Sequence, residues 1–206
     1  MMATVEHLTD VQRRMLEDAL KEYSEGNRDA LKEENDMLVQ LPLKFQEARR
    51  IEDKEDFRYI VQWKAARAWG YAKHNPETRI RSESEAAFRL ADSGKHEDAI
   101  RRLRNPALKG VETRMATAIL MFYRPERFTV LDYRAWRSLV HLRVLDPFDC
   151  WFEEPEDYPP YLEACKLLAD WFGRTLRETD RALWQLKPLS PAQGNAPKTL
   201  GAELGL

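Results

Sequence analysis

The stretch from Leu108 to Asp132 holds the residues of this chain that are best suited by type and spacing to do chemistry. Gly110 and Val111 form a tight turn ahead of a predicted helix over 113–123. Glycine permits a backbone conformation that is barred to residues with a side chain, and it lets the backbone approach a ligand closely. Free amide groups at the turn and at the start of the helix favour phosphate oxygens. The turn is therefore a candidate site for binding phosphate.

Asp132 follows an extended apolar segment, 128–131, and precedes a helix that we expect to end near Leu142. A carboxylate in this position can stabilise a positive charge that develops on a reacting group, or it can activate a water molecule. Aspartate is also a preferred residue at a helix N-terminus. Asp132 can therefore be a cap, a catalytic group, or both.

The order of these elements resembles the helix–hairpin–helix motif of the HhH-GPD base-excision DNA glycosylases. The matching positions are Leu108, Gly110, Val111, Ala116 and Asp132, and the offset of 24 residues from the leucine to the aspartate also agrees. The resemblance implies an all-α, two-lobed fold with Asp132 on the wall of a cleft. It also implies hydrolysis of the N-glycosidic bond of a base that is rotated out of duplex DNA.

In the family pattern, Asp132 is the catalytic carboxylate, because breaking an N-glycosidic bond builds positive charge on the sugar. The hairpin and the first residues of its helices bind the DNA backbone, and the hairpin carbonyls can hold a monovalent cation. The DNA-binding positions that the resemblance implies are Lys109, Gly110, Val111, Thr113, Arg114, Arg134 and Arg137. Two alternatives stay open: the Gly-Val turn can merely join two helices, and Arg134 and Arg137 can pair with acids such as Glu153 or Glu154 instead of phosphates.

Three residues depart from the family pattern. Glu112 replaces the second hairpin glycine and puts a carboxylate where a phosphate would lie, whereas Lys109 replaces the usual proline and restores a positive charge. Arg114 stands where bifunctional members carry a catalytic lysine, and a guanidinium cannot supply the amine for a Schiff base. We therefore expect a monofunctional enzyme without strand cleavage. Glu112 favours the alternative, a non-catalytic nucleic-acid-binding protein that has kept the fold.

A second candidate site lies on a predicted helix over 54–69, at Gln62, Trp63 and Lys64. Helix order places it where the family supplies polar or wedge side chains to the lesion. Trp63 can stack on a base, and Lys64 can lie near the phosphates. The alternative is that Trp63 is an ordinary core residue.

The composition limits the other classes of function. Only Cys150 and Cys165 are present, so a disulfide framework and a four-cysteine iron–sulfur cluster are excluded, and the four histidines have no metal-ligand spacing. The net charge is −2, yet residues 101–143 hold ten basic and three acidic residues, which indicates an anionic partner such as DNA. The chain shows neither a signal-peptide core nor an apolar run long enough for a membrane helix, so we expect a cytoplasmic protein.

Apolar residues recur three and four positions apart, which predicts an all-α fold. We expect a helix–hairpin–helix domain over 54–145, a second helical lobe from 1–53 plus 146–188, and a flexible tail over 189–206. Punctuating residues set the expected helix ends. Pro42 ends the second helix, Gly70 ends the helix that begins near Lys54, and Ser82 with Glu85 begins the next one as a capping box. The last two helices are predicted over 161–172 and 179–186.

Overall fold

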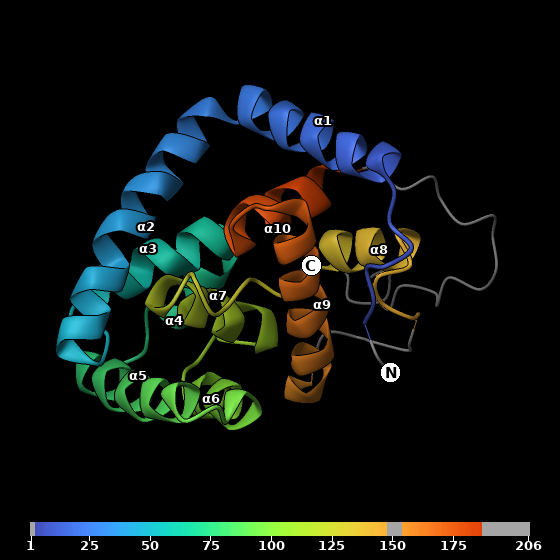
Figure 1. Ribbon diagram of the computed structural model, residues 1–206. Coiled ribbons are helices and arrows are strands. Elements are labelled where there is room, and N and C mark those ends of the chain that lie inside the picture. Colours follow the sequence, from blue (N-terminus) through green and yellow to red (C-terminus); the bar gives the residue numbers. More distant parts are fainter. Residues whose placement is uncertain (1–2, 148–153, 187–206) are drawn as a thin grey trace, which may run out of the picture.

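The computed structural model describes residues 3–147 and 154–186, and within these ranges the chain is helical with no strand (Figure 1). The predicted all-α class is confirmed. Two short 3₁₀ turns cover Ala66–Ala68 and Pro155–Asp157. The α-helices are α1 (Asp10–Gly26), α2 (Arg28–Ala48), α3 (Lys54–Ala65), α4 (Trp69–Ala72), α5 (Glu77–Asp92), α6 (His96–Leu103), α7 (Thr113–Tyr123), α8 (Tyr133–His141), α9 (Tyr158–Phe172) and α10 (Leu176–Gln185).

Helix α7 forms the centre of the core. Every residue of this helix except Arg114 is buried, and α2, α3, α5 and α6 all pack against it. Its last residue, Tyr123, stacks on Phe88 of α5 with ring centroids 3.9 Å apart. Because α7 is enclosed on several sides, it is a rigid support for the loops at its two ends.

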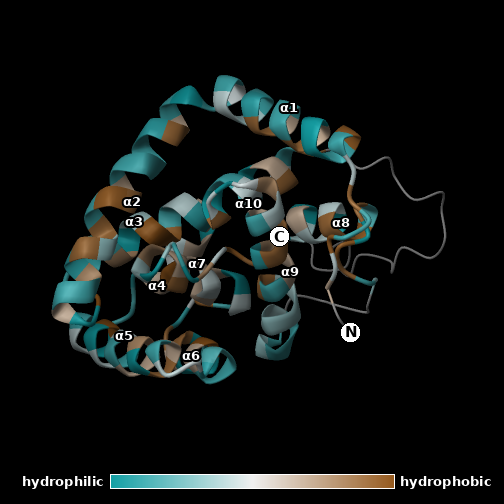
Figure 2. Ribbon diagram, in the orientation of Figure 1, coloured by the Kyte–Doolittle hydropathy of each residue, from teal (hydrophilic) through white to brown (hydrophobic). Residues whose placement is uncertain are grey.

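Helices α1 and α2 form an arch along one side of the molecule (Figure 1). Helix α1 packs on α10, and its outward side is hydrophilic (Figure 2). The guanidinium of Arg13 donates to the carbonyl oxygens of Trp171 and Phe172 and lies 4.3 Å from the Trp171 ring centroid. The N-terminal helix and the C-terminal helices therefore pack together, whereas α2 packs on α7.

The predicted end of the second helix is wrong, since α2 continues through Pro42 to Ala48. Proline removes one backbone donor from a helix. In α2, the continued helix buries Leu41 and Phe45. The free energy gained by burying these side chains offsets the lost hydrogen bond at Pro42.

The capping-box prediction at Ser82 is also wrong. Helix α5 begins at Glu77 directly after Pro76, and the Ser82 hydroxyl lies inside it, where it donates to the carbonyl oxygen of Arg79. Gly70 lies within α4 and does not end a helix, because α3 already stops at Ala65.

The last two helices both begin three residues earlier than predicted. Helix α9 contains Pro159 and Pro160 in its first turn. Proline is tolerated there because the backbone N–H groups of a first turn have no partner within the helix. Helix α10 begins after Thr175, which forms a capping box with Glu178. Cys150, Glu153 and the expected tail 189–206 lie outside the described residues. No helix in the described ranges is long and apolar enough to cross a membrane.

Candidate functional site at the start of helix α8

The extended segment 128–131 is buried and leads directly to Asp132. Two tyrosines of α9 hold its backbone. The Tyr158 hydroxyl accepts from the amide of Thr129 and donates to its carbonyl, at 3.2 and 2.8 Å. The Tyr161 hydroxyl donates to the carbonyl oxygen of Val130 at 3.0 Å. Because the backbone polar groups of an extended segment need partners, these buried phenols fix the path of the chain into Asp132.

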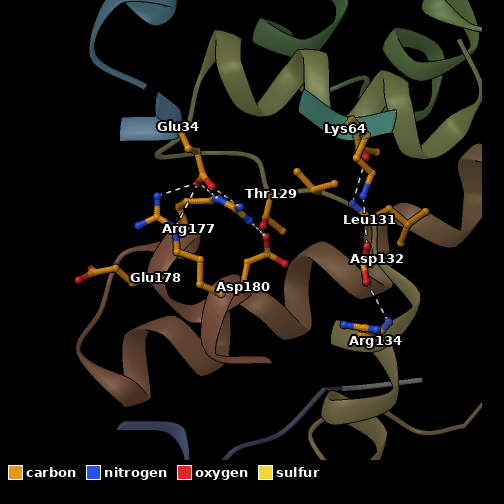
Figure 3. Close-up of polar contacts among 12 residues, drawn as sticks. Glu34, Lys64, Thr129, Leu131, Asp132, Arg134, Arg177, Glu178 and Asp180 are labelled. Carbon is orange, nitrogen blue, oxygen red and sulfur yellow. Dashed lines mark hydrogen bonds and ion pairs between the residues drawn. The ribbon is translucent and has the colours of Figure 1, made fainter. Parts of the chain in front are cut away.

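Both carboxylate oxygens of Asp132 have a donor (Figure 3). The backbone amide of Arg134 donates to Oδ1 at 2.9 Å, which confirms that Asp132 caps α8. The ammonium of Lys64, near the end of α3, donates to Oδ2 at 3.1 Å. The side chains of Asp132 and Lys64 are 22% and 17% exposed. The carboxylate is thus oriented from two sides and is still reached by solvent.

A short chain of hydrogen bonds joins the segment before Asp132 to the start of α7. The amide of Leu131 donates to Oγ1 of Thr117 at 3.0 Å, and this hydroxyl donates to the carbonyl oxygen of Arg114 at 2.9 Å. Asp132 therefore lies close to the first turns of the helix that follows the hairpin. No sequence pattern points to Thr117 beyond its place on the predicted helix over 113–123.

The hairpin turn has the conformation expected of its glycine, but the protein's own helices cover it. Gly110 has φ +74°, and an added Cβ would lie 3.0 to 3.1 Å from backbone atoms of Ala68 and Ala72. The Asn75 side chain accepts from the Lys109 amide and donates to the Lys109 carbonyl, at 2.8 and 2.9 Å. The carbonyl of Lys109, one candidate for cation binding, is thus already hydrogen-bonded. Asn75 was not predicted, and only the Asn-Pro pair at 75–76 hinted at a turn there.

The other hairpin residues divide into buried and exposed positions. Val111 and Thr113 are fully buried, backbone included, and the Val111 amide and carbonyl are hydrogen-bonded to Leu108 and Asn105, so neither residue presents accessible surface to a ligand. Lys109, Glu112 and Arg114 are exposed. Glu112 precedes α7 and makes no capping hydrogen bond with its side chain. The accessible charges of the hairpin are thus two cations and one carboxylate.

The ten basic residues between 101 and 143 fall into two groups. Five of them form ion pairs with acids: Arg101, Arg102, Arg104, Arg124 and Arg127. Among the described residues, the other five have no such partner: Lys109, Arg114, Arg134, Arg137 and Arg143. Four of these five are positions predicted to bind DNA, and they lie in the hairpin, at the start of α7 and in α8. Along the sequence, these four cations therefore lie on either side of Asp132.

The predicted second site is divided by the structure. Gln62 is exposed, whereas Trp63 packs against the core, with its ring edge-to-face on Phe122 at 5.0 Å. The guanidinium carbon of Arg177 lies 5.2 Å from the centroid of the Trp63 ring. Trp63 is thus a packing residue, and Lys64 is the member of the group that the fold brings to Asp132.

A buried network of charges lies behind the site, and it was not predicted. Arg177 and Arg181 of α10 both donate to the carboxylate of Glu34 in α2, and Arg177 also pairs with Asp180 (Figure 3). Burial raises the pKa of Asp180 to about 6, against the opposing effect of Arg177 and with a further contribution from the charge of Asp132. Burial alone would raise the pKa of Glu34, but its bonds with Arg177 and Arg181 lower it. In the sequence, only the spacing of Arg177, Asp180 and Arg181, three and four positions apart on one helix, points to ion pairs there.

A cavity of about 600 Å³ lies at a different place, between α2, the turn after α7, α9 and α10. Lys166, Arg174 and Arg177 line it together with Glu126 and Asp170, and Asp132 is not among its lining residues. The described part of the chain contains no group of three or more His, Cys, Asp or Glu side chains that could hold a metal ion.

No family model, no curated protein and no solved structure matches this chain. The function proposed below therefore rests on the contacts described above and on the resemblance carried by residues 108–137.

Proposed function

We propose that this protein is a monofunctional DNA glycosylase that hydrolyses the N-glycosidic bond of a base flipped out of duplex DNA. The proposal includes the two-lobed HhH-GPD fold, with the helix–hairpin–helix domain over 54–145. One observation carries it: the carboxylate of Asp132 is partly exposed and is oriented by Lys64 and the Arg134 amide, beside the first turns of α7.

The proposed reaction needs little from the protein beyond this carboxylate. As the bond from the sugar to the base breaks, the base leaves with the bonding electrons and takes up a proton, and positive charge develops on the sugar carbon. Asp132 stabilises this charge, and it accepts a proton from the water molecule whose oxygen bonds to that carbon. Each carboxylate oxygen accepts more than one hydrogen bond, so Asp132 can bind water while Lys64 and the Arg134 amide orient it.

The cations without acid partners account for the expected partner. Arg114 is exposed at the start of α7. The guanidinium groups of Arg134 and Arg137 in α8 lie over the rings of Trp184 and Tyr133 without an acid partner among the described residues, so we expect all three arginines to contact DNA phosphates. Phosphate contacts position a protein on DNA without reading its sequence. Arg114 also excludes the hairpin helix as the source of a Schiff-base amine, because its guanidinium stays protonated.

The test is a panel of end-labelled duplexes that each contain one altered or mispaired base, followed by alkaline cleavage at abasic sites. The proposal expects base release from at least one duplex and none from the undamaged control. Replacing Arg114 and Arg137 with glutamine should weaken binding and reduce the slope of log K against log salt by about two. The matched control replaces Arg101 and Arg127, which are paired with acids, and should leave this slope nearly unchanged.

A second candidate function is a non-catalytic nucleic-acid-binding protein with the same fold. It is favoured by the exposed Glu112 at the hairpin and by the contacts that cover Gly110 and occupy the Lys109 peptide groups. Binding that falls steeply with salt, without base release from any duplex of the panel, would support this function over hydrolysis.

A further inference from the structure

An exposed aromatic residue directly follows Asp132 in the sequence. Tyr133 is the first residue of α8, next to Asp132, and is 49% exposed. The opposite face of α8 is buried through Ala135, Ser138 and Leu139. The Ser138 hydroxyl donates to the carbonyl oxygen of Leu183 in α10 at 2.7 Å, which fixes the rotation of α8. Tyr133 is therefore held on the outer side by the packing of the helix, and its exposure does not come from a loose terminus.

The neighbours of Tyr133 form an aromatic and cationic surface. Trp136 and Arg137 follow it three and four positions later, so the three side chains share one side of the helix. The Tyr133 and Trp136 rings are nearly parallel, with centroids 5.9 Å apart and an angle of 21° between planes. The guanidinium carbon of Arg137 lies 5.9 Å from the Tyr133 ring centroid. An aromatic face beside an arginine is the arrangement that binds a nucleobase by stacking and its phosphate by charge.

We infer that Tyr133, supported by Trp136 and Arg137, forms a stacking site for an unpaired nucleobase of bound DNA. The inference rests on the proposed function for its choice of DNA as partner. The site adds what Asp132 lacks: an apolar face that makes up for the stacking energy lost when a base leaves the duplex. Phosphate contacts from Arg114 and Arg134 do not distinguish paired from unpaired bases, whereas stacking on Tyr133 does.

The chain offers a matched control at Tyr59 in α3. Tyr59 is 45% exposed, and the guanidinium carbon of Arg58 lies 5.6 Å from its ring centroid. It therefore reproduces the residue type, the exposure and the arginine neighbour of Tyr133. It differs in its distance from the candidate carboxylate along the chain and in having no parallel aromatic ring among the described residues.

The experiment compares two duplexes of the same sequence, one fully paired and one with a single unpaired adenine. Their dissociation constants are measured for the wild type, Tyr133→Ala, Tyr133→Phe and Tyr59→Ala. We expect the wild type to prefer the duplex with the unpaired adenine, and we expect Tyr133→Ala to lose about tenfold of that preference. Tyr133→Phe should retain the preference because it keeps the ring, and Tyr59→Ala should match the wild type.

A second readout separates this inference from the proposed chemistry. 2-Aminopurine at the unpaired position should lose fluorescence on binding to the wild type and to Tyr133→Phe, and should keep it with Tyr133→Ala. Quenching without base release would retain the stacking site and overturn the proposed hydrolysis. Equal behaviour of Tyr133→Ala and Tyr59→Ala, or no binding to either duplex at low salt, would overturn the stacking site. Circular dichroism of each variant confirms that the helices are intact.

Discussion

The ammonium of Lys64 and the carboxylate of Asp132 lie 3.1 Å apart although 68 positions separate the two residues in the sequence. Lys64 is the amine that the fold places at the candidate catalytic group. The hairpin position that holds an amine in the bifunctional glycosylases, which this chain resembles over residues 108–137, is Arg114. A positive charge at this position orients Asp132, but it also opposes positive charge on a nearby sugar. The role of Lys64 can be separated experimentally from that of Asp132.

Replacing Lys64 with methionine tests whether Lys64 orients the carboxylate. Asp132 then keeps only the Arg134 amide as donor, so we expect base release to slow by up to about a hundredfold through misplacement of the carboxylate. Lys54→Met is a control, because that ammonium donates to the carbonyl oxygen of Lys73 and not to Asp132. The measurement is the single-turnover rate of base release.

The monofunctional assignment predicts that borohydride traps no covalent complex between the protein and DNA. Arg114 cannot form a Schiff base, and the nitrogen of Lys64 is committed to Asp132 as a hydrogen-bonded ammonium. Denaturing gel electrophoresis of the reduced mixture makes the measurement. A trapped complex that disappears in Lys64→Arg would overturn the assignment and identify Lys64 as the attacking amine.

Alanine substitutions of Gly94 and Gly110, which have similar φ angles, test how tightly the hairpin is covered. Gly94→Ala should lower the free energy of unfolding by about 1 kcal/mol, because φ is +81° but nothing lies within 4 Å of the new methyl group. Gly110→Ala should cost about 2 kcal/mol or more, since its methyl group also meets the backbone of Ala68 and Ala72. Urea unfolding followed by circular dichroism measures both values. Equal costs would show that α4 does not press on the hairpin.

The buried Asp180 predicts a dependence of stability on pH. Its pKa is about 6 in the folded protein and near 3.8 when exposed, so between these values the folded state keeps a proton that the unfolded chain releases. This contribution to stability is complete below about pH 4 and is lost as the pH rises through 6.

Replacing Asp180 with asparagine removes this titration and keeps an oxygen toward Arg177. Relative to the wild type, Asp180→Asn should therefore gain on the order of 2 kcal/mol in free energy of unfolding between pH 4 and pH 7. Urea titrations at several pH values measure the difference, and a difference that does not change with pH would contradict the prediction.

Local patterns were enough to predict the elements around the site. The helix from Thr113 to Tyr123, the extended segment and the cap at Asp132 all agree with the sequence expectation, because each depends on residues close together in the chain. Pro42 was misleading because the burial of Leu41 and Phe45, a tertiary effect, favours the continued helix.

The contacts between distant elements could not be predicted. Nothing in the residues near Lys64 indicates that its ammonium reaches Asp132, and nothing near Asn75 indicates that its amide holds the Lys109 peptide groups. Likewise, which arginines lack an acid partner depends on ion pairs with residues in other elements. Examples are Arg127 with Asp92 and Arg104 with Glu154. The sequence therefore supplied candidate residues, and the packing determined which of them come together.

Different substitutions separate the observed cap at Asp132 from its proposed catalytic role. Asp132→Ala removes the cap of α8 and should lower the free energy of unfolding by about 1 kcal/mol. Asparagine is an equally good cap, so Asp132→Asn should keep the bond with the Arg134 amide and lose less stability than Asp132→Ala, while it removes the negative charge and the ion pair with Lys64.

The most direct measurement is the single-turnover rate of base release by the wild type and by Asp132→Asn, on the duplex of the panel that the wild type processes fastest. Both proteins should bind this duplex and unfold at similar urea concentrations. We predict that the rate falls by about a thousandfold in the variant, because the carboxylate that stabilises the sugar cation is gone. Equal rates for the two folded proteins would contradict a catalytic role for Asp132.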